Sequence, residues 1–338
     1  MKLIYPIQYL RGIAALMVVA HHATNQIAGV SDHVAFNFGP SGVDLFFVIS
    51  GFIMVVTTSD LGPQEFMKRR ILRVVPLYWL LTISMIGAAL VAPGLFKTLR
   101  FSTETVVKSL LFIPHYSLGF PGVPWPVLVP GWTLNYEMFF YLIFALSLFL
   151  PVALRLGALA LVFGVLIALG YALGPFERVE LQTYTSPLLF EFICGAAIAH
   201  LWFRERVNFP VWMSICTVAM GVFLLVQRDQ APLGYFNQML GAVLLIVGAL
   251  NGRFGRWRNR TLLALGDASY STYLTHIFTL GMVRAVWVKV VPNANTAVAA
   301  WTFMVFAMVL CAAIGWLSYR WIELPLLHQF NRRNDRAV

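Results

Sequence analysis

The chain has 338 residues, of which 59% are hydrophobic and only 11% carry a charge, and its formal net charge is +10. Soluble domains contain about 25% charged residues, so this composition excludes an ordinary soluble protein and indicates a polytopic membrane protein. The three cysteines lie singly within apolar stretches, which argues against a disulfide framework and against a cysteine metal site.

Ten apolar segments approach the length of about 20 residues that a membrane-spanning helix needs. They predict an all-α fold, a bundle of about ten transmembrane helices, and the sequence outside them is too short for a soluble catalytic domain. We therefore expect a single transmembrane domain over residues 1–338. The predicted segments are Leu3–Ala23, Gly39–Thr58, Ile71–Ala92, Gly131–Leu150, Leu156–Leu173, Ser186–Phe203, Val211–Gln227, Leu233–Leu250, Ala268–Lys289 and Ala297–Tyr319.

The distribution of Lys and Arg predicts the orientation of the chain. If the N-terminus is cytoplasmic, sixteen of these residues fall in cytoplasmic segments and seven in outside segments, with Arg11 left within the membrane. This asymmetry fits the positive-inside rule with both termini in the cytoplasm. Topology and contact with anionic lipids account for most of the basic residues, and nothing favours nucleic-acid binding.

The first segment is apolar, yet it contains Arg11 and the pair His21 and His22. A cation within a bilayer costs about 2.5–3.5 kcal/mol on insertion scales, so it usually has a partner or a function. Arg11 and His22 are eleven residues apart, so a helix places them on nearly the same face, about 16 Å apart along its axis. His21, about 100° round the helix, should face elsewhere. This stripe predicts either a ligand path or two polar side chains that reach toward the membrane surface.

Two further polar features lie in the second and third segments. Asp44 is near the start of the second segment, where it is either a carboxylate at a helix N-terminus or a functional group. Arg70 and Arg73 lie where a basic amphipathic stretch meets the third segment. Such a stretch is often a membrane-surface anchor, but residues three apart share a helix face and can grip one phosphorylated ligand.

Residues 93–130 form the longest stretch outside the predicted spans. They include a candidate amphipathic helix, Thr103–Phe112, and a proline-rich run that predicts a rigid extended loop, either a lid or an acceptor-binding surface. Glu137 follows about one and a half turns into the fourth segment, where an acid is functional or paired with a cation. The ninth segment, with His276, is rich in hydroxyl side chains that either line a polar interior or join helices.

The chain contains no G-x-S-x-G, H-E-x-x-H, P-loop or G-x-G-x-x-G motif. It does contain an imidazole and a guanidinium on one intramembrane face, arginines on the cytoplasmic side and an acid in the fourth segment. Imidazole suits base catalysis or transient acyl transfer, and arginine suits phosphate binding. From the residues alone, the chain is a membrane enzyme or a transporter for an anionic or activated substrate.

Five motifs occur in order along the chain: QYLRGIAALMVVAHH with its R-x10-H spacing, GVDLFFVISGF, FMKRRILRVVP, GWTLNYEMFFY and LGDASYSTYLTH. Together they resemble the acyltransferase family 3 integral membrane O-acyltransferases, and most closely the short forms that modify bacterial exopolysaccharides. The resemblance covers nearly the whole chain. Asn135-Tyr136 departs from the pattern, since many relatives have smaller residues before the acid, and this leaves the acceptor open.

The resemblance implies a ten-helix protein of the bacterial cytoplasmic (inner) membrane. It would move an acetyl group from cytosolic acetyl-CoA to a sugar hydroxyl of an exopolysaccharide or other cell-surface glycan, often lipid-linked, without a metal. Its partners would be acyl-CoA, a glycan or lipid-linked saccharide acceptor and membrane lipids, and its oligomeric state is open. The alternative is a transporter or flippase for a lipid-linked glycan or acyl-bearing solute that performs no transfer chemistry.

Site residues follow from the same resemblance. Arg11 and His22 correspond to the essential pair of the first helix, Arg70 and Arg73 to the R-x-x-R motif, and Glu137 to the acid of the W-[ST]-L-x-x-E block. We expect the three arginines to bind the donor and His22 to activate the hydroxyl or to carry the acetyl group briefly. Glu137, together with Asp44, would orient His22 or hold the acceptor, which makes these three residues the candidate catalytic set.

Overall fold

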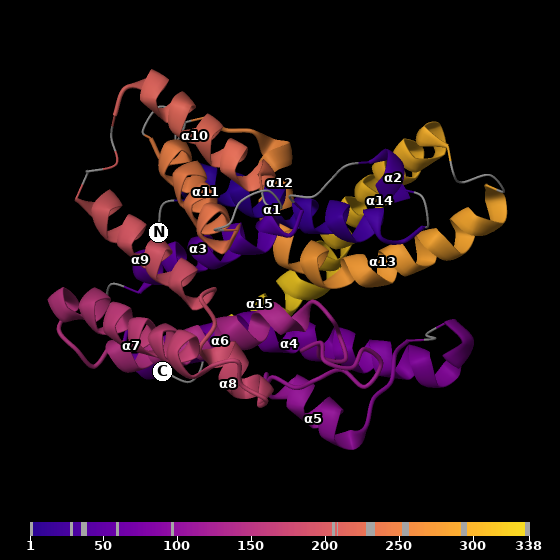
Figure 1. Cartoon of the computed structure of the whole chain (residues 1–338), viewed down its shortest axis with the longest axis horizontal. Coiled ribbons are helices and arrows are strands. Elements are labelled where there is room, and N and C mark those ends of the chain that lie inside the picture. Colours follow the sequence, from indigo (N-terminus) through magenta and orange to yellow (C-terminus); the bar gives the residue numbers. More distant parts are fainter. Residues whose placement is uncertain are drawn as a thin grey trace. The chain divides into compact units, whose positions relative to one another are not determined.

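The computed structural model describes residues 3–27, 30–34, 39–58, 61–95, 98–204, 207, 209–227, 234–251, 257–291 and 296–334. Regular structure in these residues is helical throughout, which confirms the all-α fold (Figure 1). Each of the ten predicted apolar segments forms a helix. These helices are α1 (Tyr5–Thr24), α3 (Ser41–Thr57), α4 (Pro63–Val91), α6 (Gly131–Ser147), α7 (Val152–Leu173), α9 (Leu189–Phe203), α10 (Val211–Val226), α11 (Gly234–Ala249), α13 (Ser269–Val290) and α14 (Ala297–Ser318).

Shorter helical elements lie between these ten helices or follow the last of them. They are α2 (Val30–His33), the 3-10 turn η1 (Pro93–Leu95), α5 (Thr103–Leu110), α8 (Val179–Tyr184), α12 (Arg260–Asp267), the π-helical turn η3 (Tyr319–Glu323) and α15 (Leu324–Asn334).

The clearest boundary difference from the sequence prediction is in α4. The basic stretch and the third apolar segment are one helix of 29 residues that begins at Pro63. Proline is favoured in the first helical turn because its missing N–H has no partner there in any case. Arg70 and Arg73 therefore lie inside a long continuous helix, and Pro76 is accommodated within it.

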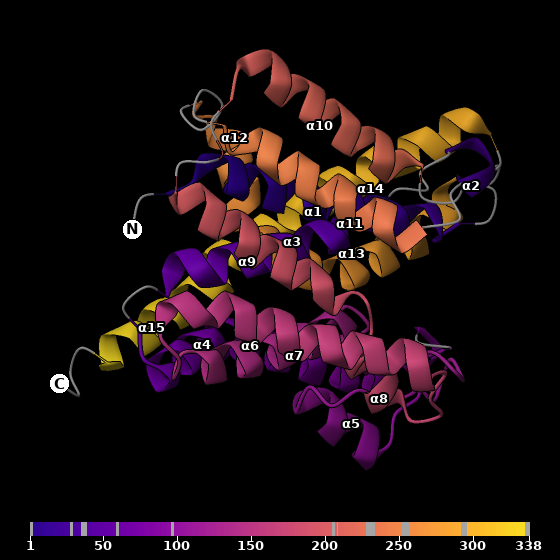
Figure 2. The same ribbon diagram turned by 60° about the vertical axis from the view of Figure 1, so that its left-hand side comes forward.

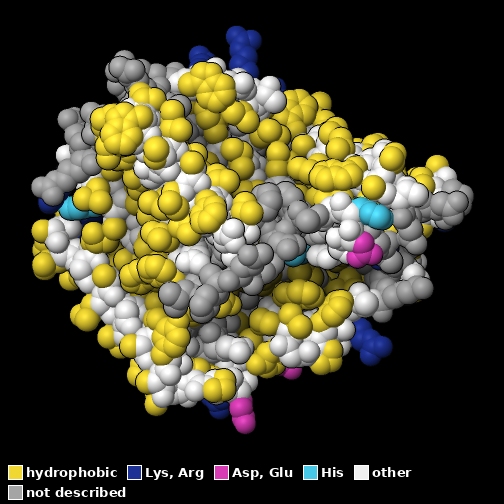
Figure 3. Space-filling view, turned by 45° about the horizontal axis from the view of Figure 1, so that its top comes forward, with side chains coloured by type: hydrophobic (Ala, Val, Ile, Leu, Met, Phe, Trp, Pro, Cys, Tyr) yellow, Lys and Arg dark blue, Asp and Glu magenta, His cyan; other side chains and the backbone are white. Residues whose placement is uncertain are grey.

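The chain is a multi-pass membrane protein. Four stretches of the described chain are long and apolar enough to cross a membrane: Pro63–Val91, Val152–Leu173, Val179–Phe203 and Ala297–Gln329. The helices α3, α10 and α11 are also apolar but shorter. Apolar side chains cover much of the face in Figure 3, and charged side chains are few on it. The total of about ten spans and the side of the membrane on which each terminus lies stay predictions.

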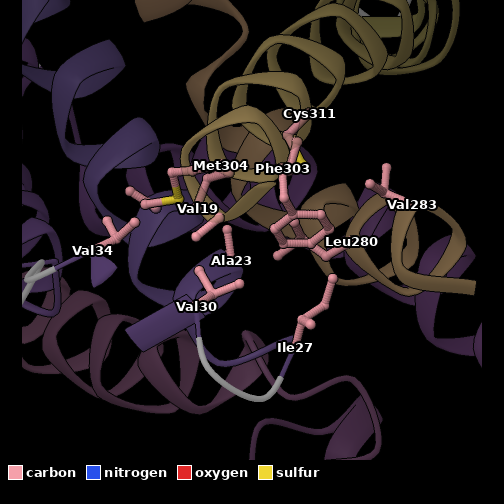
Figure 4. Packing of buried hydrophobic residues seen from close by; sticks show 13 residues of the cluster. Val19, Ala23, Ile27, Val30, Val34, Leu280, Val283, Phe303, Met304 and Cys311 are labelled. Carbon is pink, nitrogen blue, oxygen red and sulfur yellow. The ribbon is translucent and has the colours of Figure 1, made fainter. Parts of the chain in front are cut away.

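Contacts within the chain define two compact units, and the expectation of a single domain stays a prediction. The first unit comprises Met1–Ile53 and Cys194–Pro325. In it α1 packs against α12, α13 and α14, while α10 and α11 lie side by side, as both ribbon views show (Figure 2). Buried side chains of α1, α2, α13 and α14 form an apolar core in which Val19 and Ala23 face Leu280, Phe303 and Met304 (Figure 4).

The contact between α1 and α12 is unusually close. A Cβ atom on Gly266 would lie 2.1 Å from the carbonyl oxygen of Gln8, so only glycine fits there. The Tyr9 hydroxyl lies 2.7 Å from the Trp257 carbonyl oxygen, to which it donates, and accepts from the Asn259 N–H at 2.7 Å. Asn259 in turn caps α12, since its side-chain oxygen accepts from the Leu262 N–H at 3.0 Å. These bonds fix α12 against the N-terminal half of α1.

The second unit comprises Met54–Ile193 and Leu326–Val338. Its core is aromatic. The rings of Phe140 and Phe192 stack with centroids 4.4 Å apart, Phe163 lies 5.9 Å from Phe140, and Phe66 lies 5.1 Å from Phe144. Large apolar rings of α4, α6, α7 and the start of α9 therefore hold this unit together.

The helix α5 and the loop after it confirm part of the prediction for residues 93–130. Ser102 and Thr105 form a reciprocal capping box, with bonds of 3.2 and 2.8 Å, that begins α5. The helix ends before Phe112, whose φ of 57° is left-handed. The Ser109 hydroxyl then accepts from the Val127 N–H at 3.0 Å and lies 3.3 Å from His115 Nε2. His115 is thus a structural residue of the loop.

Candidate active site

One unbroken helix, α1, carries Arg11 and His22, as predicted. Arg11 Nη1 donates to Gln8 Oε1 at 2.8 Å, and Gln8 Nε2 donates to Asp267 Oδ1 of α12 at 3.4 Å. Arg11 is therefore part of a polar chain that ends at a carboxylate. Such a chain lowers the cost of placing a guanidinium in an apolar surrounding.

The half-buried ring of His22 lies between two other histidine rings. The His21 ring meets it edge to face with centroids 5.3 Å apart, and the expectation that His21 faces a different direction stays a prediction. On another side the ring of His276, from α13, lies 5.0 Å away at an interplanar angle of 34°. The sequence did not predict this second pairing, because 254 residues separate the two histidines.

The start of α3 lies against α1 close to these histidines. A Cβ atom on Gly42 would lie 2.4 Å from the Ala14 carbonyl oxygen, and one on Gly39 would lie 2.4 Å from His21 Cβ. Asp44 is in the first turn of α3 and only 4% exposed. A carboxylate there is stabilised by the positive end of the helix dipole, as the helix-terminus interpretation expects.

The polar face of α13 is buried, which both sequence interpretations allow. Its buried polar side chains are Ser269, Ser271, Thr272, Thr275, His276 and Thr279. The His276 Nδ1 atom lies 2.5 Å from the Tyr273 carbonyl oxygen, and the Tyr273 ring packs against Phe46 of α3 with centroids 5.6 Å apart. Within the first unit, α1, α3 and α13 thus surround the His22 and His276 rings.

Glu323 is a buried carboxylate that the sequence analysis did not single out. It ends the π-helical turn η3, and its Oε2 accepts from the Ser271 hydroxyl at 2.7 Å. The helices come close here, because a Cβ atom on Gly315 would lie 2.1 Å from Thr272 Oγ1. An acid inside an apolar segment would have carried the same signal as Arg11 or Glu137. The position of Glu323 just beyond the predicted end of the last segment hid it.

In the second unit, Arg70 and Glu137 belong to one cluster. Arg70 Nη2 donates to Thr57 Oγ1 at 2.8 Å, and its guanidinium lies over the Phe66 ring, 5.5 Å from the centroid. The Tyr141 ring meets Phe66 edge to face at 6.2 Å, and the Tyr141 hydroxyl donates to Glu137 Oε1. The sequence predicted each of these charged residues separately, and the packing of α4 against α6 joins them.

Arg73 follows Arg70 by three residues on the same helix, so both lie on one face of α4. The neighbouring cation Arg69 differs, because its Nε atom forms an exposed ion pair with Glu65 at 2.7 Å. Arg70 is thus fixed by polar and aromatic contacts, while Arg69 is a surface residue. In the part of the chain that the structure describes, no group of His, Cys, Asp and Glu side chains is arranged to hold a metal ion.

Comparison with known proteins gives a family match along almost the whole chain. A family model described as an acyltransferase domain matches residues 4–320. The exopolysaccharide production protein ExoZ of Rhizobium meliloti is 38% identical over 308 residues, which cover 89% of this chain and 94% of that protein. The peptidoglycan O-acetyltransferase OatA of Listeria monocytogenes is 24% identical over 369 residues, 96% of this chain and 56% of that protein. No solved structure gives a significant match.

Proposed function

We propose that this chain, which belongs to acyltransferase family 3, moves an acetyl group from cytosolic acetyl-CoA to a sugar hydroxyl of an exopolysaccharide or another cell-surface glycan. The observation that carries this proposal is the similarity to ExoZ along nearly the full length of both proteins, because ExoZ is named for exopolysaccharide production. The relatives named as O-acetyltransferases support the acetyl group and the hydroxyl acceptor.

The membrane arrangement that we propose follows from the charge distribution. About ten helices would cross the bacterial cytoplasmic membrane, with both termini in the cytoplasm. The basic N-terminal part of α4 would then face the compartment that contains acetyl-CoA, and a glycan or lipid-linked saccharide would be acetylated from the other side. Transfer through the membrane requires polar groups inside the bundle, and the buried polar face of α13 together with the half-buried Arg11 and His22 of α1 would supply such groups.

We assign donor binding to Arg70, Arg73 and Arg11. Arginine offers a planar fork of donors that matches phosphate oxygens, so two arginines on one face of α4 suit the phosphates of CoA. The Thr57 hydrogen bond and the Phe66 ring hold the Arg70 guanidinium in place before the donor arrives. Glu137 accepts a hydrogen bond from the Tyr141 hydroxyl in the same cluster, and its role in orienting His22 or holding the acceptor stays a prediction.

We assign the chemical step to His22. As a neutral imidazole, it accepts the proton of the sugar hydroxyl while the hydroxyl oxygen attacks the thioester carbonyl carbon. The carbon–sulfur bond then breaks, and the CoA thiolate takes the proton from the His22 imidazolium. In the alternative route the His22 nitrogen attacks first and passes the acetyl group to the hydroxyl. Asp44, in the first turn of α3, would orient the imidazole or the acceptor.

The test is acetyl transfer from labelled acetyl-CoA in proteoliposomes that contain purified protein and a glycan acceptor. Wild type is compared with His22→Ala and with His21→Ala, a matched control that removes a histidine from the neighbouring position. We expect label to leave CoA with wild type and His21→Ala and not with His22→Ala. Activity that survives in His22→Ala and is lost in His21→Ala would overturn the assignment of His22. If wild type and both variants show neither turnover nor CoA binding, the proposed function is refuted.

A further inference from the structure

The buried ring of His276 has a defined orientation. Its Nδ1 atom lies 2.5 Å from the Tyr273 carbonyl oxygen, and a carbonyl oxygen can only accept a hydrogen bond. The proton of the neutral ring is therefore on Nδ1, and Nε2 carries a lone pair. This assignment comes from the hydrogen-bond partner, which is the usual way to fix a histidine tautomer.

The Nε2 atom of His276 is an acceptor without a donor. The side chain is 0% exposed, and this nitrogen has no hydrogen-bond partner in the described part of the chain. Buried polar atoms are nearly always hydrogen-bonded, so an unpartnered one indicates a donor that binds it only in another state of the protein. Neither lipid nor solvent reaches the ring, because α13 buries this face against its neighbours.

The nearest group that could supply the donor is His22. The two ring centroids are 5.0 Å apart, so the ring edges come within hydrogen-bonding range when a nitrogen of each ring faces the other. The planes are tilted by 34°, and a rotation of the half-buried His22 ring about its side-chain bond is enough to change which of its atoms faces His276. His276 is fixed by its bond to the backbone, whereas His22 can turn.

We infer that His276 is a positioning residue for acyl transfer: its Nε2 atom accepts a hydrogen bond from one ring nitrogen of His22, so that the other His22 nitrogen presents its lone pair to the acceptor hydroxyl. This inference rests on the proposed function. When His22 takes the hydroxyl proton, its second N–H stays bonded to His276, and the proton later leaves with the CoA thiolate. The role matches that of the carboxylate behind the histidine in a hydrolase triad, with a neutral imidazole in its place.

Two substitutions distinguish the role of Nε2 of His276 from that of Nδ1. In His276→Gln the amide oxygen reaches the region of Nε2 and can still accept from His22. In His276→Asn the shorter amide ends near Nδ1, so it can keep the bond to Tyr273 but offers nothing to His22. A purely structural histidine would be replaced better by asparagine, and a positioning histidine better by glutamine.

The assay measures kcat and KM for acetyl-CoA in proteoliposomes, beside the melting temperature of each purified variant in detergent. We expect His276→Gln to keep kcat within about tenfold of wild type and His276→Asn to lose about 100-fold or more, with KM for acetyl-CoA unchanged in both. Equal kcat in the two variants, or a higher kcat for His276→Asn, would overturn the inference. A wild type that transfers no acetyl group would instead refute the proposed function, so the two failures are distinguishable.

A chemical rescue covers the case in which His276→Gln does not fold. His276→Ala leaves a space of ring size, which imidazole or pyrrole can fill. Both small molecules carry an N–H donor, but only imidazole has a basic lone pair. We expect imidazole to restore turnover and pyrrole not to do so. Equal recovery with both, or recovery with neither, would overturn the role that we assign to Nε2.

Discussion

Replacing Arg70 by glutamine should weaken donor binding by a predictable amount. Glutamine is neutral and its amide nitrogen ends where the Arg70 Nε atom lies, so both the hydrogen bond from Nη2 to Thr57 and the charged fork over the Phe66 ring are lost. A hydrogen bond to a charged group contributes about 1.5–3 kcal/mol, and each 1.4 kcal/mol corresponds to a tenfold change in affinity. We therefore expect KM for acetyl-CoA to rise by about 10- to 100-fold with little change in kcat, since the donor phosphates are remote from the reacting carbonyl.

The matched control is Arg69→Gln, one residue away. Arg69 carries the same charge, but its ion pair with Glu65 is exposed and contributes only about 0.3–0.5 kcal/mol. Initial rates over a range of labelled acetyl-CoA concentrations, at low and high salt, give both constants for each variant. A similar rise of KM in both variants would mean that the basic stretch acts only through its total charge. That result would refute the assignment of Arg70 as a specific phosphate ligand.

Three further predictions concern stability. Gly315→Ala should lower the free energy of unfolding by about 1–3 kcal/mol and lower the melting temperature, because the new Cβ would lie 2.6 Å from a backbone atom of α13. The control Gly164→Ala should leave the melting temperature unchanged, because the space around Gly164 is open. Phe192→Ala should lower the free energy of unfolding by about 3–5 kcal/mol, because it removes a ring from the aromatic core. Phe190→Ala is the control, since the Phe190 side chain is 41% exposed, and equal melting temperatures of the two variants would contradict the prediction. Ser102→Ala should destabilise the first turn of α5 by about 1 kcal/mol, because it removes the side chain that caps this helix. We expect faster amide hydrogen exchange in that turn, and unchanged protection would argue against the cap.

The helices themselves could be predicted because apolarity in a membrane protein is a local property. Each long apolar segment must satisfy its backbone hydrogen bonds internally, so it forms a helix whatever its neighbours are. The boundaries were less predictable where polar residues continue a helix. Thus α4 extends back to Pro63 through its basic stretch, and the chain after the last apolar segment continues through a π-helical turn into α15.

The site could be predicted only along single helices. The spacing of Arg11 and His22 follows from helical geometry once α1 is a helix, and the same is true of Arg70 and Arg73. The pairing of His22 with His276 required the packing of α1 on α13, which no local pattern encodes. The contact is possible because α1 contacts α12, α13 and α14 together, and such contacts depend on the shapes of all their side chains.

The unbroken course of α1 also sets a length. With Arg11 and His22 on one face of a single helix, the rise of the helix separates their Cα atoms by about 16 Å along its axis. A donor whose phosphate is bound at Arg11 must then carry its acyl group on an arm long enough to reach the imidazole. Acetyl phosphate, in which the acyl and phosphate groups adjoin, cannot bridge that distance. The fixed spacing along α1 would thus favour acyl donors in which a long arm separates the phosphate from the acyl group.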